Sequence, residues 1–357
     1  MPRFVYRGDV LESTYDIAAT YDENYRKGPC FRSQPPVVKR AGDASFLGLA
    51  VRSRLGVAAG LLLNSKWIDA YAQRGFDILT YKTVRSSHRD CYPLPNWVFV
   101  TERDDGRYES IDPGAALSGD PSSISSSVCF GIPSMAPEVW RGDIAVAKSK
   151  LAPGQLLIVS VVATPEEHWG VDELAADFVQ CAKWATEAGA DIIEANLSCP
   201  NVCSAEGSIY LDPPTSRNIA GAIKQAIGQV PLLAKTGHFD DDARLSDYLA
   251  ALDGVANGVT MVNCLIREVI HPDGKPVFGD TFAQAGVLGR AIHDSCVDSV
   301  HRTARIIKNC GHALEIAAVG GVSARQDMDD FLAAGADAVL LGSSPMYQPN
   351  IAADLHG

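Results

Sequence analysis

Short apolar runs alternate with longer amphipathic segments from Phe46 to the end of the chain. Each run is bounded by Gly, Pro, Ser or Asn, which is typical of strands buried on both faces of a parallel sheet. The pattern predicts eight strands, which are Leu55–Ala59, Asp77–Lys82, Leu156–Val162, Ile192–Leu197, Leu232–Lys235, Val259–Asn263, Ile316–Val319 and Ala338–Leu341.

The segments between most of these runs have apolar residues at helical spacing and are predicted to be helices. Examples are Trp67–Arg74, Val171–Ala188, Ser216–Ile227, Asp241–Leu252, Val297–Lys308 and Arg325–Ala334. A helix that ends at Gly335, followed directly by a strand, illustrates the repeating unit. Repeated strand–helix units favour an α/β fold of the closed (β/α)8 TIM barrel type over an open sheet.

Two connections are much longer than the others. About 70 residues separate Lys82 from Leu156, and about 50 separate Asn263 from Ile316. Because both insertions follow strands, we expect them to cover the C-terminal face of the barrel. The Ser-rich run Pro121–Ser127, in the first insertion, is predicted to be a mobile loop.

The chain divides into two regions by composition. Residues 1–45 are polar and irregular, and we expect them to form an N-terminal extension packed on a barrel domain of residues 46–357. The net charge of −12 argues against a nucleic-acid-binding surface. No apolar run is long enough for a membrane span or a signal peptide. Nine scattered cysteines without CxxC spacing indicate reduced thiols of a cytoplasmic protein, and neither disulfides nor a metal site.

Polar or small residues stand where the predicted strands end, and in a barrel these ends meet at one mouth. They are Ala58-Ala59-Gly60, Lys82-Thr83, Asn196, Lys235-Thr236, Asn263, Gly320-Gly321 and Gly342-Ser343. A lysine that closes a buried strand is costly unless it meets an anion or an acceptor. One such lysine could point to the surface by accident, but two lysines beside two asparagines indicate a site.

The glycine motifs at the ends of the last two strands match the usual phosphate site of this architecture. Glycines at Gly320-Gly321 and Gly342 let backbone N–H groups approach a phosphate, and Ser343 adds a hydroxyl donor. Each motif alone also fits an ordinary turn, but their position favours a phosphate-bearing ligand. Ala58-Ala59-Gly60 provides small residues against which a flat ring could lie, although close core packing would explain it equally well.

The densest polar cluster is Asn196-Leu197-Ser198-Cys199-Pro200-Asn201. Asn196 and Ser198 should point to one side and Leu197 to the other, and Pro200 ends the strand pairing. The alternative is a polar turn with an inert buried cysteine. The whole string resembles the signature of dihydroorotate dehydrogenases, in the class whose catalytic base is a cysteine (class 1-like), and dihydropyrimidine dehydrogenases carry a similar string. The resemblance extends over residues 46–347.

The resemblance implies FMN at the barrel mouth. The implied cofactor-binding residues are Ala58, Ala59, Gly60, Lys82, Thr83, Asn196, Lys235, Gly289, Gly320, Gly321, Gly342 and Ser343. Lys235 would lie near the N1–O2 edge of the flavin, where a fixed cation stabilises the reduced ring.

The implied reaction oxidises (S)-dihydroorotate to orotate in pyrimidine biosynthesis, with hydride transfer to flavin N5. Cys199, as a thiolate, would remove the proton from C5, with Ser198 and Lys235 as further catalytic residues. The implied substrate-binding residues are Lys82, Phe130, Gly131, Ile132, Asn196, Asn201, Asn263 and Cys264. Residues 202–214 would form a lid that carries the base.

Three residues depart from the family pattern. Val128 stands where a substrate-binding Asn is expected, Cys264 replaces Ser, and Asn96 replaces Arg. A buried site that hydrogen-bonds its substrate discriminates strongly. One alternative is therefore a related flavin enzyme acting on another dihydropyrimidine, cyclic amide or unsaturated substrate. Another is a non-redox phosphate-binding barrel, which leaves the lysines and the cysteine unexplained.

The implied partners are a small-molecule substrate and a second copy in a homodimer, without nucleic acid or membrane. The electron acceptor stays open between fumarate and NAD reached through an iron–sulfur partner subunit.

Overall fold

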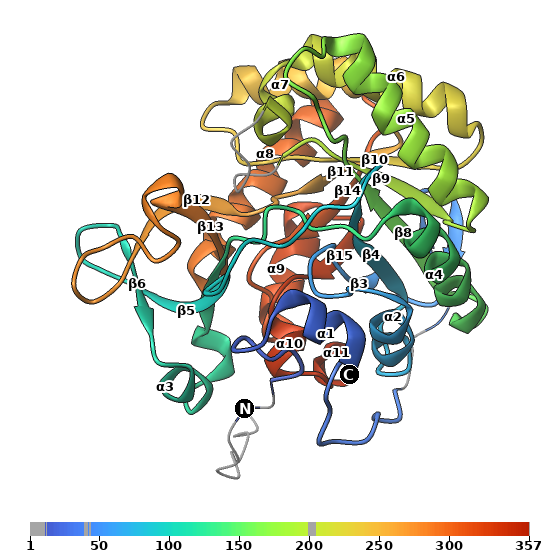
Figure 1. The fold of residues 1–357 in the computed structure, drawn as a ribbon. Helices are drawn as coiled ribbons and strands as arrows, with labels where there is room; N and C mark the ends of the chain where they lie inside the picture. Colours follow the sequence, from blue (N-terminus) through green and yellow to red (C-terminus); the bar gives the residue numbers. More distant parts are fainter. Residues whose placement is uncertain (1–10, 12, 39–41, 43, 199–204, 357) are drawn as a thin grey trace.

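The computed structural model describes residues 11, 13–38, 42, 44–198 and 205–356 of the chain. Eight parallel strands close into a barrel in which β15 pairs with β3, so the predicted TIM barrel is confirmed (Figure 1). The strands are β3 (Leu55–Val57), β4 (Ile78–Val84), β8 (Leu156–Val161), β9 (Ile192–Asn196), β10 (Leu232–Lys235), β11 (Gly258–Met261), β14 (Glu315–Val319) and β15 (Ala338–Leu341). Each corresponds to a strand predicted from the apolar pattern.

Helices surround the barrel (Figure 1). They are α2 (Ser65–Ala72), α4 (Pro137–Lys150), α5 (Val171–Glu187), α6 (Pro213–Ile227), α7 (Asp242–Leu252), α8 (His293–Cys310) and α9 (Arg325–Ala334), followed by α10 (Ser344–Tyr347) and α11 (Ile351–His356). The predicted helices are confirmed, although α8 begins at His293 instead of Val297. Within the described part of the chain, no helix combines the length and apolar character needed to cross a bilayer.

The barrel interior is apolar at its N-terminal end. Side chains alternate along each strand, and the inward-facing set includes Ile78, Ile192, Leu233 and Leu340. The same cluster contains Phe46 from the hairpin of β1 (Ala44–Phe46) and β2 (Leu49–Val51), which closes this end of the barrel. The polar residues are thereby left for the opposite end, where the strands finish.

The two long insertions combine into a second, smaller sheet (Figure 1). The first insertion supplies β5 (Trp97–Glu102), β6 (Tyr108–Ile111) and β7 (Ser125–Val128), and the second supplies β12 (Leu265–Ile270) and β13 (Gln284–Gly289). The order is β12-β13-β7-β5-β6, and β6 returns to pair with β12. Both insertions follow strands of the barrel, as expected. Their strands pair with each other in a single sheet.

The remaining short elements lie in the connections. They are α3 (Pro113–Leu117) and the 3₁₀ helices η1 (Pro121–Ser123), η2 (Ala205–Leu211), η3 (Asp280–Phe282) and η4 (Arg290–Ile292).

The expectation that Pro121–Ser127 forms a loop is wrong for its second half. Ser125, Ser126 and Ser127 are buried in β7, which lies between β5 and β13. The Ser127 hydroxyl donates to the carbonyl of Gly286 over 3.0 Å, 159 residues away in the sequence. Serine is common in turns, but a strand can bury it when its hydroxyl finds a backbone acceptor.

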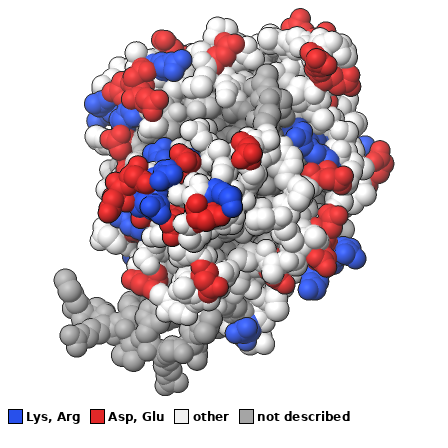
Figure 2. All heavy atoms as spheres, turned by 60° about the vertical axis from the view of Figure 1, so that its left-hand side comes forward, with Lys and Arg blue, Asp and Glu red and all other residues white. Residues whose placement is uncertain are grey.

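The outer face of the second sheet carries charges of both signs, and Figure 2 shows acidic and basic side chains intermixed there. Arg103 pairs with Glu109, while Arg107 lies 2.7 Å from Asp105 and 3.7 Å from Glu268. Because these pairs lie at the solvent-accessible surface, each contributes little to stability.

The N-terminal extension is less irregular than expected, since it contains α1 (Tyr21–Lys27) with a capping box at Thr20. The Tyr15 ring is fully buried, with its centroid 5.3 Å from that of Trp97 and 6.1 Å from that of Phe130. The Thr14 amide donates to the carbonyl of Met346 in α10 over 2.8 Å. The extension therefore packs against both the first insertion and α10 as part of the core.

We expect Tyr15→Ala to lower the free energy of unfolding by about 3–5 kcal/mol, because it leaves a cavity among aromatic rings. Tyr15→Phe retains the ring and should cost about 1 kcal/mol or less. Urea and thermal unfolding of both variants measure the difference. A loss below about 1 kcal/mol for Tyr15→Ala would mean that the extension does not belong to the core.

Candidate active site

A cavity lies between the C-terminal end of the barrel and the second sheet. The barrel side contributes Ala58, Ala59, Gly60, Leu61, Lys235, Asn263, Val319, Gly320, Gly321, Gly342 and Ser343. The other side contributes Trp97, Val128, Phe130, Leu288, Gly289 and Ile292. The fold thus brings most of the predicted cofactor-binding residues, although far apart in sequence, to one enclosed space.

Two glycines of this cavity are required by close backbone contacts. A Cβ at Gly321 would lie 2.5 Å from the Gly289 carbonyl oxygen, and one at Gly289 would lie 2.4 Å from the Ile124 oxygen. Both glycines also have positive φ, of 69° and 89°. By contrast, a Cβ at Gly60 or Gly342 would meet nothing within 4 Å. These two glycines therefore border free space, into which a ligand can bring its atoms close to the backbone.

Lys235 is the last residue of β10, and its side chain is 3% exposed. The strand register places it beside Asn196 of β9 and Thr260 of β11. Among the described residues its ammonium has no hydrogen-bond or ion-pair partner, and it lines the cavity. Because an unpaired buried charge is costly, an anionic or hydrogen-bond-accepting ligand at this position would be stabilised.

Two asparagines connect the ends of β9 and β11, the strands on either side of β10. Asn263 Nδ2 donates to Asn196 Oδ1 over 3.2 Å and makes a short hydrogen bond to the Ser198 carbonyl. The Ser198 amide also donates to Asn196 Oδ1, over 3.3 Å. This network fixes the backbone at Ser198 and leaves Asn263 on the cavity wall. The predicted residues Cys199 and Asn201 lie outside the described residues.

The predicted substrate turn Phe130–Ile132 is held by a buried arginine. Arg85 is fully buried, and its Nε donates to the Ile132 carbonyl over 3.0 Å while Nη1 donates to Ala163 over 2.6 Å. Ile132 has a φ of 53°, and a Cβ at Gly131 would lie 2.6 Å from the Tyr92 ring. Phe130 lines the cavity, so Arg85 holds the backbone that presents it.

Lys82 and Thr83 lie in a different place from the other cofactor candidates. They border a small separate hollow with Tyr21 and Trp140, and the Thr83 hydroxyl donates to Ser160 Oγ over 3.0 Å. Cys264 is buried directly after Asn263 but does not line the cavity. The predicted residues therefore form one large group at the cavity and a smaller group beside it.

The thiol of Cys91 lies near the Lys82 side of the site. Burial raises the pKa of this thiol to about 12, although the positive charge of Lys82 opposes the shift. A thiol with this pKa stays protonated at neutral pH and cannot act as a base or nucleophile. Burial thus disfavours Cys91 as a base.

Sequence reasoning missed Arg85 and the apolar wall formed by Trp97, Leu288 and Ile292. Arg85 had a usable signal, because a charged residue directly after a buried strand has to find acceptors. The apolar wall had no such signal in the sequence, because the second sheet that carries it forms only when the two insertions pair.

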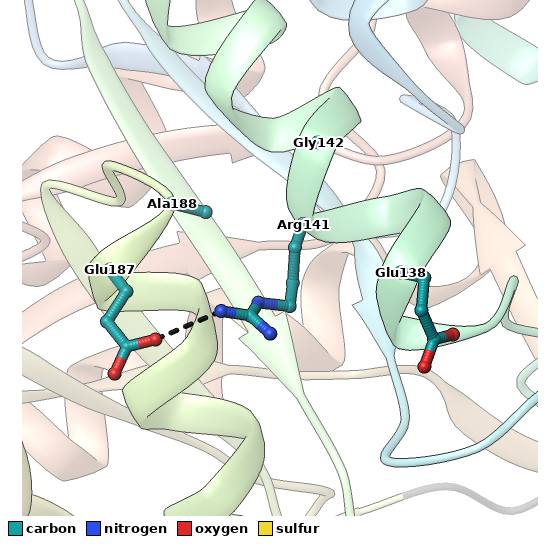
Figure 3. Close-up of a pocket in the computed structure, with 5 residues that line it drawn as sticks. All are labelled: Glu138, Arg141, Gly142, Glu187 and Ala188. Carbon is teal, nitrogen blue, oxygen red and sulfur yellow. Dashed lines mark hydrogen bonds and ion pairs between the residues drawn. The ribbon is translucent and has the colours of Figure 1, made fainter.

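A further hollow lies outside the barrel between α4 and α5, and Figure 3 shows the residues around it. Arg141 of α4 lies 3.2 Å from Glu187 of α5, and both side chains are exposed. None of the predicted site residues that the structure describes borders this hollow. It contains an ordinary surface ion pair, which contributes little to stability.

Residues 141–356 match the family model described as dihydroorotate dehydrogenase. A dihydroorotate dehydrogenase of Dictyostelium discoideum is 33% identical over 361 residues, which cover 96% of this chain and 96% of that protein. The catalytic subunit of dihydroorotate dehydrogenase B (NAD(+)) of Thermoanaerobacter sp. is 30% identical over 179 residues, 50% of this chain and 56% of that protein. Dihydroorotate dehydrogenase A (fumarate) of Limosilactobacillus reuteri is 32% identical over 181 residues, 49% of this chain and 56% of that protein.

The fold is shared with a crystal structure of the Eimeria tenella dihydroorotate dehydrogenase in complex with ferulenol. The two structures align with a TM-score of 0.68 and 16% sequence identity, over 88% of this chain and 82% of the other. At this identity the likeness supports the barrel architecture alone.

We expect Arg85→Met to destabilise the protein by about 2–4 kcal/mol, because two buried carbonyls lose a charged donor. Arg141→Met removes an arginine of the exposed pair in Figure 3 and should cost about 1 kcal/mol or less. Thermal unfolding of the two variants tests this difference. Equal losses would mean that Arg85 does not hold the turn.

Proposed function

Because the chain belongs to the dihydroorotate dehydrogenase family, we propose that it is an FMN-dependent enzyme that oxidises (S)-dihydroorotate to orotate in pyrimidine biosynthesis. As a member of this family it is an oxidoreductase acting on a CH–CH group. The observation that carries the proposal is the cavity, which joins the glycine loops after β14 and β15 to Lys235, whose ammonium pairs with none of the residues that the structure describes.

The donors around the cavity fit FMN. A phosphate suits Gly320, Gly321, Gly342 and Ser343, which offer backbone N–H groups and a hydroxyl. The open space in front of Gly60 and Gly342 gives a flavin room to approach the backbone. Among the described lining residues the one charged side chain is Lys235, and no carboxylate opposes an anion.

When bound, FMN supplies a two-electron acceptor for the hydride of the substrate. Lys235 would hold a positive charge where the ring gains electron density, which favours reduction. Asn196, Asn263 and Asn201, with Lys82, would bind the amide edges of the substrate, since an amide side chain both donates and accepts. Phe130, which lines the cavity, would complete the substrate pocket, with Gly131, Ile132 and Cys264 close to the residues that line it.

Cys199 would take the proton from the substrate carbon, as in the cysteine class of the family. The neighbouring Ser198 and Asn196 are tied to Asn263, so the segment that carries Cys199 starts from a fixed anchor. Loss of the proton to a thiolate requires that the thiol is first ionised, which limits the reaction at low pH.

A second candidate is a flavin oxidoreductase that acts on another dihydropyrimidine, cyclic amide or unsaturated substrate. Val128 favours it, because this residue lines the cavity where a hydrogen-bonding Asn would be expected. An apolar side chain cannot pair with a polar group of the substrate, and unpaired buried polar groups weaken binding.

We also propose that the protein acts in the cytoplasm as a homodimer of a barrel domain, residues 46–357, with its extension, residues 1–45. Fumarate, or NAD reached through an iron–sulfur partner, would take the electrons.

Purified protein should show a flavin absorbance spectrum that bleaches on anaerobic titration with dihydroorotate. A protein without flavin would contradict both candidates. A flavin that dihydroorotate does not bleach would contradict the first candidate and favour the second.

We expect Cys199→Ser to retain flavin but to slow its reduction by substrate about 10²–10⁴-fold at neutral pH, because a hydroxyl is a poorer base. Cys310→Ser, at an exposed cysteine, is the matched control and should leave the rate unchanged. Anaerobic stopped-flow absorbance measures both. An unchanged rate in Cys199→Ser would remove this cysteine from the mechanism.

A further inference from the structure

His293 is buried behind the predicted phosphate loop and has no role in the reaction proposed above. It is the first residue of α8 and is 2% exposed. Its Nδ1 lies 3.0 Å from the Gly320 carbonyl oxygen. On the other side, Nε2 lies 3.4 Å from Asp330 Oδ2 and 3.8 Å from Asp327 Oδ1.

These contacts determine where the protons of the imidazole ring are. A carbonyl oxygen only accepts, so Nδ1 must carry a hydrogen that it donates to Gly320. The Gln326 amide, with smaller effects of His293 and Arg290, holds the pKa of Asp330 below its usual range, so this carboxylate is ionised. A neutral ring would turn the lone pair of Nε2 toward two carboxylates, whereas a protonated Nε2 is attracted by both.

The ring connects both ends of the loop that follows β14. A Cβ at Gly321 would lie 2.9 Å from the Cβ of His293, so α8 packs directly behind the loop. At the other end, Asp327 Oδ2 accepts from the amides of Ser323 and Ala324 over 2.8 and 2.9 Å. His293 therefore contacts the first residue of the loop and the carboxylate that holds its last two.

The charged groups around the ring come from three elements. Asp327 and Asp330 face it from α9, and the Phe331 ring of α9 lies across it with centroids 5.2 Å apart. Arg290 of η4 is paired with Asp294 of α8 at 2.9 Å. The acidic groups of α9 thus compensate a positive charge on the ring.

We propose that His293 is a positioning residue that, as an imidazolium, fixes the Gly320–Gly321 loop and adds positive charge behind the phosphate of FMN. The proposal rests on the proposed function for the identity of the ligand. An imidazole ring carries this charge only while both of its nitrogens are protonated, so the contribution of His293 to phosphate binding depends on the second proton.

The test compares FMN binding to the apoproteins of wild type and His293→Asn by quenching of flavin fluorescence at pH 6 and pH 9. Asparagine can still donate to Gly320 but carries no charge. We expect FMN affinity to fall about tenfold in the variant at pH 6 and much less at pH 9. The phosphate of FMN titrates equally in both measurements, so the ratio of affinities is unaffected by it.

Two controls separate charge from structure. Riboflavin, which lacks the phosphate, should bind wild type and His293→Asn with similar affinity at both pH values. His312→Asn, at the other end of α8 where the ring lies 3.2 Å from Asp253, should leave FMN affinity unchanged. An affinity loss that is the same at both pH values, or that extends to riboflavin, would overturn the proposal.

A second readout does not require the cofactor. With ¹⁵N-labelled histidine, the resonance pair that disappears in His293→Asn should have the shifts of two protonated ring nitrogens at pH 6. A neutral ring, or a metal ion on Nε2 found by elemental analysis, would overturn the proposal. If neither wild type nor His293→Asn binds FMN, the proposed function fails. Titration of both proteins with inorganic phosphate then decides whether His293 supports an anion site.

Discussion

Three stretches of backbone meet behind the cavity at distances that only glycine permits. Gly289 contacts the carbonyl of Ile124, and Gly321 contacts the carbonyl of Gly289. The first contact lies within the second sheet, and the second joins that sheet to the barrel. A side chain at Gly321 would push the two sheets apart, and one at Gly289 would disturb the pairing within the second sheet. The glycines therefore hold the two sheets together as well as giving a ligand access to backbone N–H groups.

Segments that are far apart in the chain also form one wall of the cavity. Trp97 and Phe130 line the cavity on one side and pack against Tyr15 on the other. The N-terminal segment, the first insertion and the cavity are thus one packed unit. A wall supported from behind in this way holds its shape before a ligand arrives, which lowers the ordering cost of binding.

The sequence was sufficient for features that depend on local pattern. The barrel strands are short and apolar over their whole length, and the glycines at positions 320, 321 and 342 follow them directly. The second sheet could not be found in this way, because Ser127 and its partner Gly286 are 159 residues apart. Arg85 and Trp97 acquire their roles only through that sheet and its connections. Glu194 is fully buried in β9, although buried charged residues are rare and nothing local marked it as unusual.

Charge completes the argument for an anion-binding cavity. The chain as a whole carries −12, which repels anionic ligands at a distance. At ordinary ionic strength, salt screens most of that repulsion at distances beyond about 10 Å. Interactions between buried charges are screened much less. The site therefore depends on its own cations: Lys235 at the end of β10 and the imidazolium proposed for His293. Asp327 and Asp330 lie on the far side of His293 from Gly320, so they stabilise its charge without facing the cavity.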